Sequence, residues 1–107
     1  PDAVLSPFRS SVISSFESKS DDDIFKWGAK QAYLAMGNML TVCATQGIDA
    51  CPMEGFDPEQ YDRYFKLNAQ GLRSVLVMPI GYRAQDDMFS TMHKVRKPLE
   101  DSIIEIK

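Results

Sequence analysis

The stretch that decides the fold runs from Ser20 to Gly47 and reads SDDDIFKWGAKQAYLAMGNMLTVCATQG. Ser20 can cap a helix, and three aspartates follow it where the positive end of a helix dipole favours acids. Gly47 suits the left-handed position just after a helix, so we predict a helix over residues 21–46. This helix is apolar on nearly every side and must therefore be covered all round. Because a chain of 107 residues holds too little other protein to cover it, we expect a partner chain.

Composition is typical of one small soluble domain. Hydrophobic residues make up 44% of the chain and charged residues 25%, which are ordinary values. The net charge of −3 argues against nucleic acid or an anionic membrane as the main partner. No apolar run approaches the roughly 20 residues of a membrane span, and the first residues lack a secretory signal. Cys43 and Cys51 have no CxxC neighbour or His/Cys cluster, so we expect two reduced thiols, no metal site and a cytoplasmic protein.

Two further segments are read from local signals. Residues 1–20 are rich in serine, which predicts an irregular, lid-like segment with a helical turn, although Val12, Ile13 and Phe16 could support a short helix. The sequence Asp57-Pro58-Glu59-Gln60 has a capping aspartate, a proline at the first helical position and a glutamine at the third. It predicts a second helix that ends near Lys66.

The strands predicted from the sequence are too few to form a sheet. Residues 74–82 form a continuous apolar run with β-branched residues, the pattern of a strand buried on both faces. Pro79 lies within it and cannot donate to a ladder. Residues 83–98 are predicted to be an extended loop and residues 102–107 a short strand. With only that tail and residues 47–50 as neighbours, we expect the sheet to be completed by another chain or by more of the same protein.

The loop Cys51-Pro52-Met53-Glu54-Gly55-Phe56 suggests a ligand site. A carboxylate between an apolar residue and a glycine, soon after a proline, has no obvious packing purpose. It is typical of backbone held in a fixed shape so that its N–H groups meet a ligand; the alternative is a surface turn before the second helix. Near the C-terminus, Lys94 and Arg96 alternate on a segment predicted to be extended, so both side chains should point the same way and could hold a phosphate. The alternative for this pair is a solvated basic patch.

Several stretches, in this order along the chain, resemble the C-terminal half of the nitroreductase family of FMN-dependent, NAD(P)H-oxidising enzymes. They are Trp27–Leu40, Gly47–Asp49, Cys51–Asp57, Val77–Arg83 and Lys94–Pro98. The resemblance implies an α+β fold with a central, mainly antiparallel sheet flanked by helices, in an intertwined homodimer. It places helix 21–46 at the dimer interface and the C-terminal tail as a strand on the partner's sheet. It makes residues 1–107 part of a single domain whose N-terminal half, with further FMN-holding residues, is not in this sequence.

The resemblance also assigns a flavin site. The cofactor-binding residues that it implies are Pro52, Met53, Glu54, Gly55, Lys94 and Arg96. Backbone N–H groups of Glu54 and Gly55 would donate to N5 and O4 of the flavin, and Lys94 and Arg96 would contact its phosphate. Glu54 is also the candidate catalytic residue, where its side chain would order water or the nicotinamide rather than donate a proton.

The implied activity is the transfer of hydride from NAD(P)H through FMN to a nitroaromatic, a quinone or a free flavin. The alternative from a different class is a truncated, non-catalytic dimerisation module of the same fold without flavin. Trp27, Tyr33 and Met36 could be mistaken for cofactor contacts, but their helical spacing favours core or interface positions.

Overall fold

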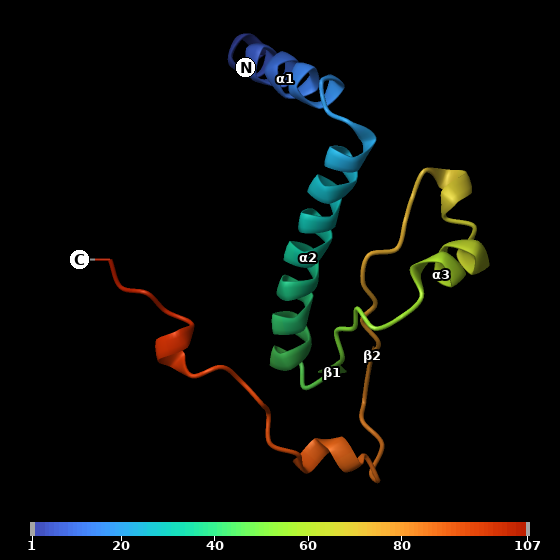
Figure 1. The fold of residues 1–107 in the computed structure, drawn as a ribbon, viewed down its shortest axis with the longest axis vertical. Helices are drawn as coiled ribbons and strands as arrows, with labels where there is room; N and C mark the ends of the chain where they lie inside the picture. The colour runs from blue at the N-terminus through green and yellow to red at the C-terminus, as the bar shows by residue number, and fades with distance from the viewer. Residues whose placement is uncertain (1, 107) are drawn as a thin grey trace.

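The computed structural model describes residues 2–106. Pro1 and Lys107, which the predictions for the N-terminal segment and the tail included, lie outside the described residues. The elements, in chain order, are α1 (Asp2–Glu17), α2 (Asp21–Thr45), β1 (Asp49–Ala50), α3 (Pro58–Phe65), η1 (Asn68–Gln70), β2 (Ile80–Gly81), η2 (Met88–Thr91) and η3 (Leu99–Asp101). In Figure 1, α2 stands as a central rod with α1 at its N-terminal end and the β1–β2 ribbon at its C-terminal end.

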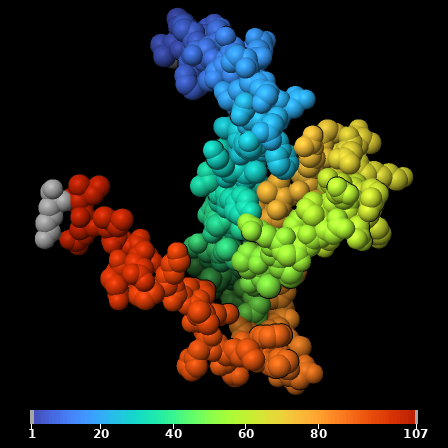
Figure 2. Space-filling model, viewed as in Figure 1, coloured from blue at the N-terminus to red at the C-terminus, as the bar shows by residue number. Residues whose placement is uncertain are grey.

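The chain is open and does not close a core of its own. Its radius of gyration is 19.4 Å, whereas a compact chain of this length has about 13 Å. Its accessible surface of 9793 Å² exceeds the roughly 6,000 Å² of a folded monomer of this mass by roughly 3,800 Å². Cys43 is the one buried apolar residue among residues 2–106, and Figure 2 shows the separate arms of the chain. The prediction that α2 finds too little covering protein in this chain is therefore confirmed.

Both ends of α2 have the predicted chemistry. At the N-terminus, the Asp23 amide donates to Ser20 Oγ over 3.2 Å, and the Ser20 hydroxyl donates to the Asp23 carboxylate over 2.6 Å. At the C-terminus, the Ile48 amide donates to the Cys43 carbonyl over 2.9 Å and the Gly47 amide to the Ala44 carbonyl over 3.3 Å. This pair of bonds forms a Schellman motif, which satisfies carbonyls that the helix leaves free.

The backbone conformation at position 47, rather than a lack of space for a side chain, requires glycine. Its φ is +68°, and a Cβ built on it meets nothing within 4 Å. Replacing Gly47 by alanine should lower the free energy of unfolding by about 1 kcal/mol, the cost of a left-handed residue with a side chain. Urea unfolding measures this change. Gln46→Ala is the matched control because φ at Gln46 is −92°; an equal loss in both variants would contradict the explanation.

The prediction that residues 1–20 are irregular is wrong, because residues 2–17 form helix α1. Apolar side chains recur at helical spacing, at Leu5, Phe8, Val12 and Phe16, and this periodicity outweighs the serines and one internal proline. The ring of Phe16 packs edge-to-face on the ring of Trp27 of α2, with centroids 4.9 Å apart. The other apolar residues of α1 are exposed, so α1 attaches to the rest of the chain mainly at its C-terminal end.

Helix α3 begins and ends as predicted. The Gln60 amide donates to Asp57 Oδ1 over 3.1 Å, and Lys66 adopts a left-handed conformation at the C-terminal end. A buried carboxylate on this helix, Asp62, joins it to the next segment. The amide and hydroxyl of Ser74 lie 2.8 Å and 2.7 Å from Asp62 Oδ1, within hydrogen-bonding distance. These contacts hold α3 against the segment that leads to β2.

The strand predicted over residues 74–82 is wrong in its extent and burial. The structure has a two-residue strand, β2, paired antiparallel with β1, and an isolated bridge between Met53 and Val77 in the same register. Between them, the Cys51 amide donates to the Pro79 carbonyl over 3.1 Å. Because Pro79 has no N–H, the reciprocal bond cannot form, and the ladder is interrupted there. Residues 74–78 are half-buried and β2 is exposed, because the described part of the chain places no second layer over β2.

The C-terminal arm carries no strand among its described residues. Residues 103–106 have no regular structure and follow the short helix η3, so the predicted strand over residues 102–107 is absent here. A strand needs a neighbour to bond with, and Figure 1 shows the arm leading away from α2 and the ribbon. The predicted loop 83–98 is mostly irregular but includes η2. Within residues 2–106, no helix combines the length and apolar character needed to cross a membrane.

Candidate functional site

The predicted ligand loop, residues 51–56, is joined to the ribbon at its start and makes a local turn at its end, in both cases through backbone hydrogen bonds. At its start, the Met53 amide donates to the Val77 carbonyl over 2.8 Å, and the Val77 amide returns a bond of 3.0 Å to the Met53 carbonyl. At its end, the Phe56 amide donates to the Glu54 carbonyl over 2.9 Å. The loop is therefore anchored to the ribbon at Met53, and the turn over residues 54–56 leads from there to the start of α3.

Two consecutive amides of this loop are left without a protein acceptor. Cys51, Met53 and Phe56 all donate to backbone carbonyls, but within residues 2–106 the amides of Glu54 and Gly55 donate to no protein atom. A Cβ built on Gly55 meets nothing within 4 Å, so the backbone there faces open space. Adjacent, fixed N–H donors beside open space are suited to a ligand that presents hydrogen-bond acceptors.

The Glu54 side chain turns back to α2 and is held there. The Tyr33 hydroxyl donates to Glu54 Oε1. This bond, together with desolvation and the negative charge of Glu54, raises the pKa of Tyr33 above its ordinary value of 10.0. Met36, one turn further along α2, lines a hollow of about 310 Å³ together with Pro52, Met53 and Glu54. The sequence predicts a core or interface position for Tyr33. The signal for its bond to Glu54 is the hydroxyl itself, because a tyrosine hydroxyl on a largely apolar helix usually finds a hydrogen-bond partner.

The two predicted phosphate ligands, Lys94 and Arg96, do not lie in the hollow beside Glu54. Lys94 lines a different hollow of about 490 Å³, formed by the β1–β2 ribbon and η2. The Arg96 guanidinium donates to the carbonyl of its neighbour Val95 over 2.8 Å. This single chain therefore groups Pro52, Met53 and Glu54 but leaves the basic pair apart from them, and a common role for the two groups stays a prediction.

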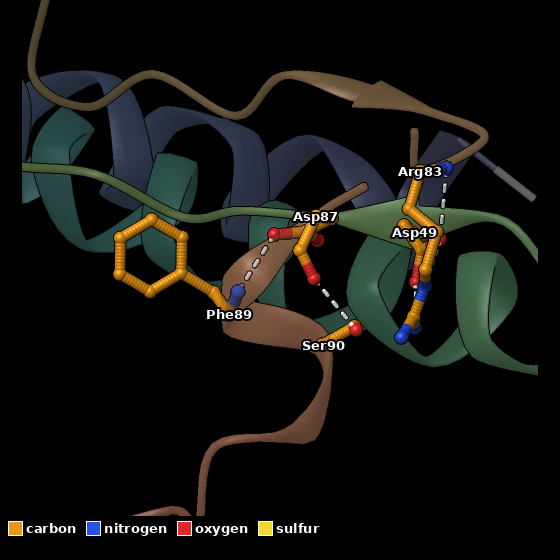
Figure 3. A network of polar contacts seen from close by, with 5 residues as sticks. All are labelled: Asp49, Arg83, Asp87, Phe89 and Ser90. Carbon is orange, nitrogen blue, oxygen red and sulfur yellow. Dashed lines mark hydrogen bonds and ion pairs between the residues drawn. The ribbon is translucent and has the colours of Figure 1, made fainter. Parts of the chain in front are cut away.

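Sequence reasoning missed an ion pair between Asp49 of β1 and Arg83, which follows β2 (Figure 3). Both residues line the same hollow as Lys94. The Asp49 carboxylate accepts from the backbone amide of Arg83 over 3.1 Å and from its Nε over 2.8 Å, and Arg83 Nη2 pairs with Asp49 Oδ1. The pKa of Asp49 lies below its ordinary value of 3.8, chiefly because of these side-chain hydrogen bonds from Arg83. Asp87, the residue that caps the start of η2, accepts a hydrogen bond from the Phe89 amide over 2.9 Å. The ion pair between Asp49 and Arg83 fixes the register of β1 and β2 next to this hollow.

The lowered pKa of Asp49 predicts a pH-dependent contribution to stability. Since the folded carboxylate resists protonation, the contribution is complete above the ordinary pKa of 3.8 and is lost as the pH falls through the lower folded value. The difference in urea midpoint between the wild type and Asp49→Asn should be constant above about pH 5 and narrow below about pH 4. Urea unfolding of both proteins across this range measures it. A difference that widens toward low pH would contradict the assignment.

Comparison with known proteins now identifies the family. A model of the nitroreductase family matches residues 8–82, well over half of the chain. The chain belongs to the nitroreductase family. This confirms the resemblance to the family, while the assignment of the chain to its C-terminal half stays a prediction. Membership gives the chain a nitroreductase-like fold, which agrees with its helices and small antiparallel ribbon.

Two enzymes of named activity are similar to this nitroreductase-family chain. The oxygen-insensitive NAD(P)H nitroreductase of Salmonella typhimurium is 42% identical over 84 residues, which cover 78% of this chain and 39% of the relative. The enzyme of the same name from Enterobacter cloacae is 41% identical over 85 residues, which cover 79% of this chain and 38% of the relative. The chain thus spans about two fifths of the length of these relatives.

Proposed function

We propose that this protein is an FMN-dependent oxidoreductase that takes hydride from NAD(P)H and passes it to a nitroaromatic, a quinone or a free flavin. The observation that carries the proposal is the pair of fixed, unpartnered amides at Glu54 and Gly55. The names of the relatives, which are NAD(P)H nitroreductases, support the donor and the reaction class. When bound, FMN supplies the group that accepts and then releases the hydride.

The residues of the loop fit a flavin by the chemistry of their donors. A flavin ring presents acceptor atoms at N5 and O4, and backbone N–H groups can bond to them without adding a group that titrates. The open space at Gly55 allows a flat ring to approach the backbone closely. Met36, Pro52 and Met53 supply an apolar lining to the same hollow. In this proposal Glu54 is the catalytic residue, because its side chain lies at the hollow and orders the nicotinamide or a water there.

The loop alone does not supply the contacts for the FMN phosphate or for the rest of the flavin site. We assign Lys94 and Arg96 to the FMN phosphate, where a guanidinium fork and an ammonium group neutralise its charge. We further propose that this chain is the C-terminal half of a subunit in an intertwined homodimer. The excess accessible surface of roughly 3,800 Å² over a closed monomer supports a large covered area, of the size that obligate partners bury.

In this arrangement α2 lies at the dimer interface and the C-terminal arm adds a strand to the partner's sheet. The exposed apolar residues of α2, which include Leu34 and Val42, support the first assignment. The arm, which finds no strand partner among residues 2–106, supports the second. The partners are then a second subunit and a small-molecule acceptor in the cytoplasm, with neither nucleic acid nor a membrane among them.

Steady-state kinetics test the reaction. Because one hollow must serve donor and acceptor in turn, double-reciprocal plots of rate against NAD(P)H at several fixed quinone concentrations should give parallel lines. Intersecting lines would contradict the shared site. If added FMN supports no NAD(P)H oxidation by the purified protein, the function is wrong and the non-catalytic dimerisation module is the better description.

A further inference from the structure

The Glu54 carboxylate is tied to a different element from the loop that carries it. Its Oε1 accepts a hydrogen bond from the hydroxyl of Tyr33, which lies in the middle of α2, 21 residues earlier. The loop itself is anchored to the ribbon by the two backbone bonds between Met53 and Val77, and its Phe56 amide bonds back to the Glu54 carbonyl within the loop. At Glu54 and Gly55, the Tyr33 bond is the one side-chain hydrogen bond to another element that residues 2–106 provide. It therefore fixes the part of the loop where the two free amides lie.

This contact is poorly placed to stabilise the fold and well placed to orient the loop. Tyr33 is 39% exposed and Glu54 is also exposed, and interactions between exposed polar groups contribute little to stability because water competes for both partners. The helix that carries Tyr33 also carries Met36, which lines the hollow beside Glu54. A long helix is a rigid support, and side chains that bind a ligand are held most accurately from such elements.

We propose that Tyr33 is a positioning residue for the flavin site: its hydroxyl holds the Glu54 side chain against α2 and so keeps the amides of Glu54 and Gly55 directed at the ligand. This inference rests on the proposed function. Tyr33 touches neither the cofactor nor the substrate in this role and acts through Glu54. Without the hydroxyl, the Glu54 side chain is free to rotate, and the peptide between Glu54 and Gly55 loses its one side-chain anchor.

The test is a double-mutant cycle read out by FMN affinity and by the spectrum of the bound flavin. Tyr33→Phe removes the hydroxyl and keeps the ring; Glu54→Ala removes its acceptor. Tyr64→Phe is the matched control, because Tyr64 is 81% exposed on α3 and lies outside the site. We expect Tyr33→Phe to raise the dissociation constant of FMN about three- to tenfold. It should also change the visible circular dichroism of the bound flavin and leave the melting temperature unchanged, whereas Tyr64→Phe should alter none of these.

Coupling between the two residues decides the assignment. Adding Tyr33→Phe to Glu54→Ala should cause no further loss of FMN affinity, because the bond is already broken. Independent, additive losses would overturn the positioning role. If the wild type binds FMN and Tyr33→Phe binds it equally tightly with an unchanged spectrum, the positioning role is overturned while the proposed function stands. A wild type that binds no FMN overturns the proposed function, and the role of Tyr33 falls with it.

Discussion

Replacing both Lys94 and Arg96 by alanine should weaken FMN binding about a hundredfold. A charge-assisted hydrogen bond to a phosphate is worth enough to change affinity about tenfold, and the two residues contact it separately. Isothermal titration of the flavin-free protein with FMN measures the change. Riboflavin, which has the same ring system without the phosphate, should bind the variant and the wild type alike.

Lys97→Ala is the matched control for this pair. It removes one positive charge from the same exposed segment but lies outside the predicted pair. Lys97→Ala should raise the dissociation constant of FMN by less than about twofold, which is the effect of a screened surface charge. An equal loss from Lys97→Ala and from Lys94→Ala would mean that the segment attracts the phosphate only through its overall charge, and the assignment of individual ligands would be wrong.

Replacing Asp62 by alanine should cause the largest loss of stability among single changes on α3, about 2 kcal/mol. Asp62 is 7% exposed, and the amide of Ser74 loses its acceptor when the carboxylate is removed. Urea unfolding gives the free energy. Asp62→Asn keeps an acceptor oxygen and should lose about half as much.

The exposed Asp86 provides the control for Asp62. Asp86→Ala changes the net charge by the same amount, and it should alter stability by less than about 0.5 kcal/mol. If Asp62→Ala were as mild as Asp86→Ala, the bond from Ser74 would not hold α3 to the following segment, and the packing of α3 described above would be wrong.

Local chemistry was readable from the sequence wherever one or two residues determine a backbone feature. Ser20, Gly47 and Asp57 each marked a helix end correctly, because caps and left-handed positions depend on neighbouring atoms alone. The same reasoning failed for α1, where the serines were given more weight than the apolar spacing from Leu5 to Phe16. Propensity is a weak guide when it opposes periodicity.

Features that depend on residues far away in the sequence are harder to predict from the sequence. The length of the strand at residues 80–81 and the state of the tail depend on which neighbours are present to bond with, and sequence pattern does not give their positions. The composition of the ligand loop is enough to locate it in the sequence. Its hydrogen bond to Tyr33 of α2 is not predictable, because nothing in the spacing brings residues 33 and 54 together. The arrangement of Lys94 and Arg96 relative to that loop likewise depends on long-range contacts that sequence spacing does not specify.

In the proposed function, the loop at Glu54 and Gly55 serves a bound, reducible FMN. The most direct measurement is the flavin content of the protein purified without added cofactor, followed by anaerobic addition of NADH or NADPH to the same sample. We expect FMN bound at one molecule per chain, whose yellow absorbance is bleached by the reduced nicotinamide. A colourless protein that takes up no FMN, or a bound FMN that neither NADH nor NADPH reduces, would contradict the proposed function.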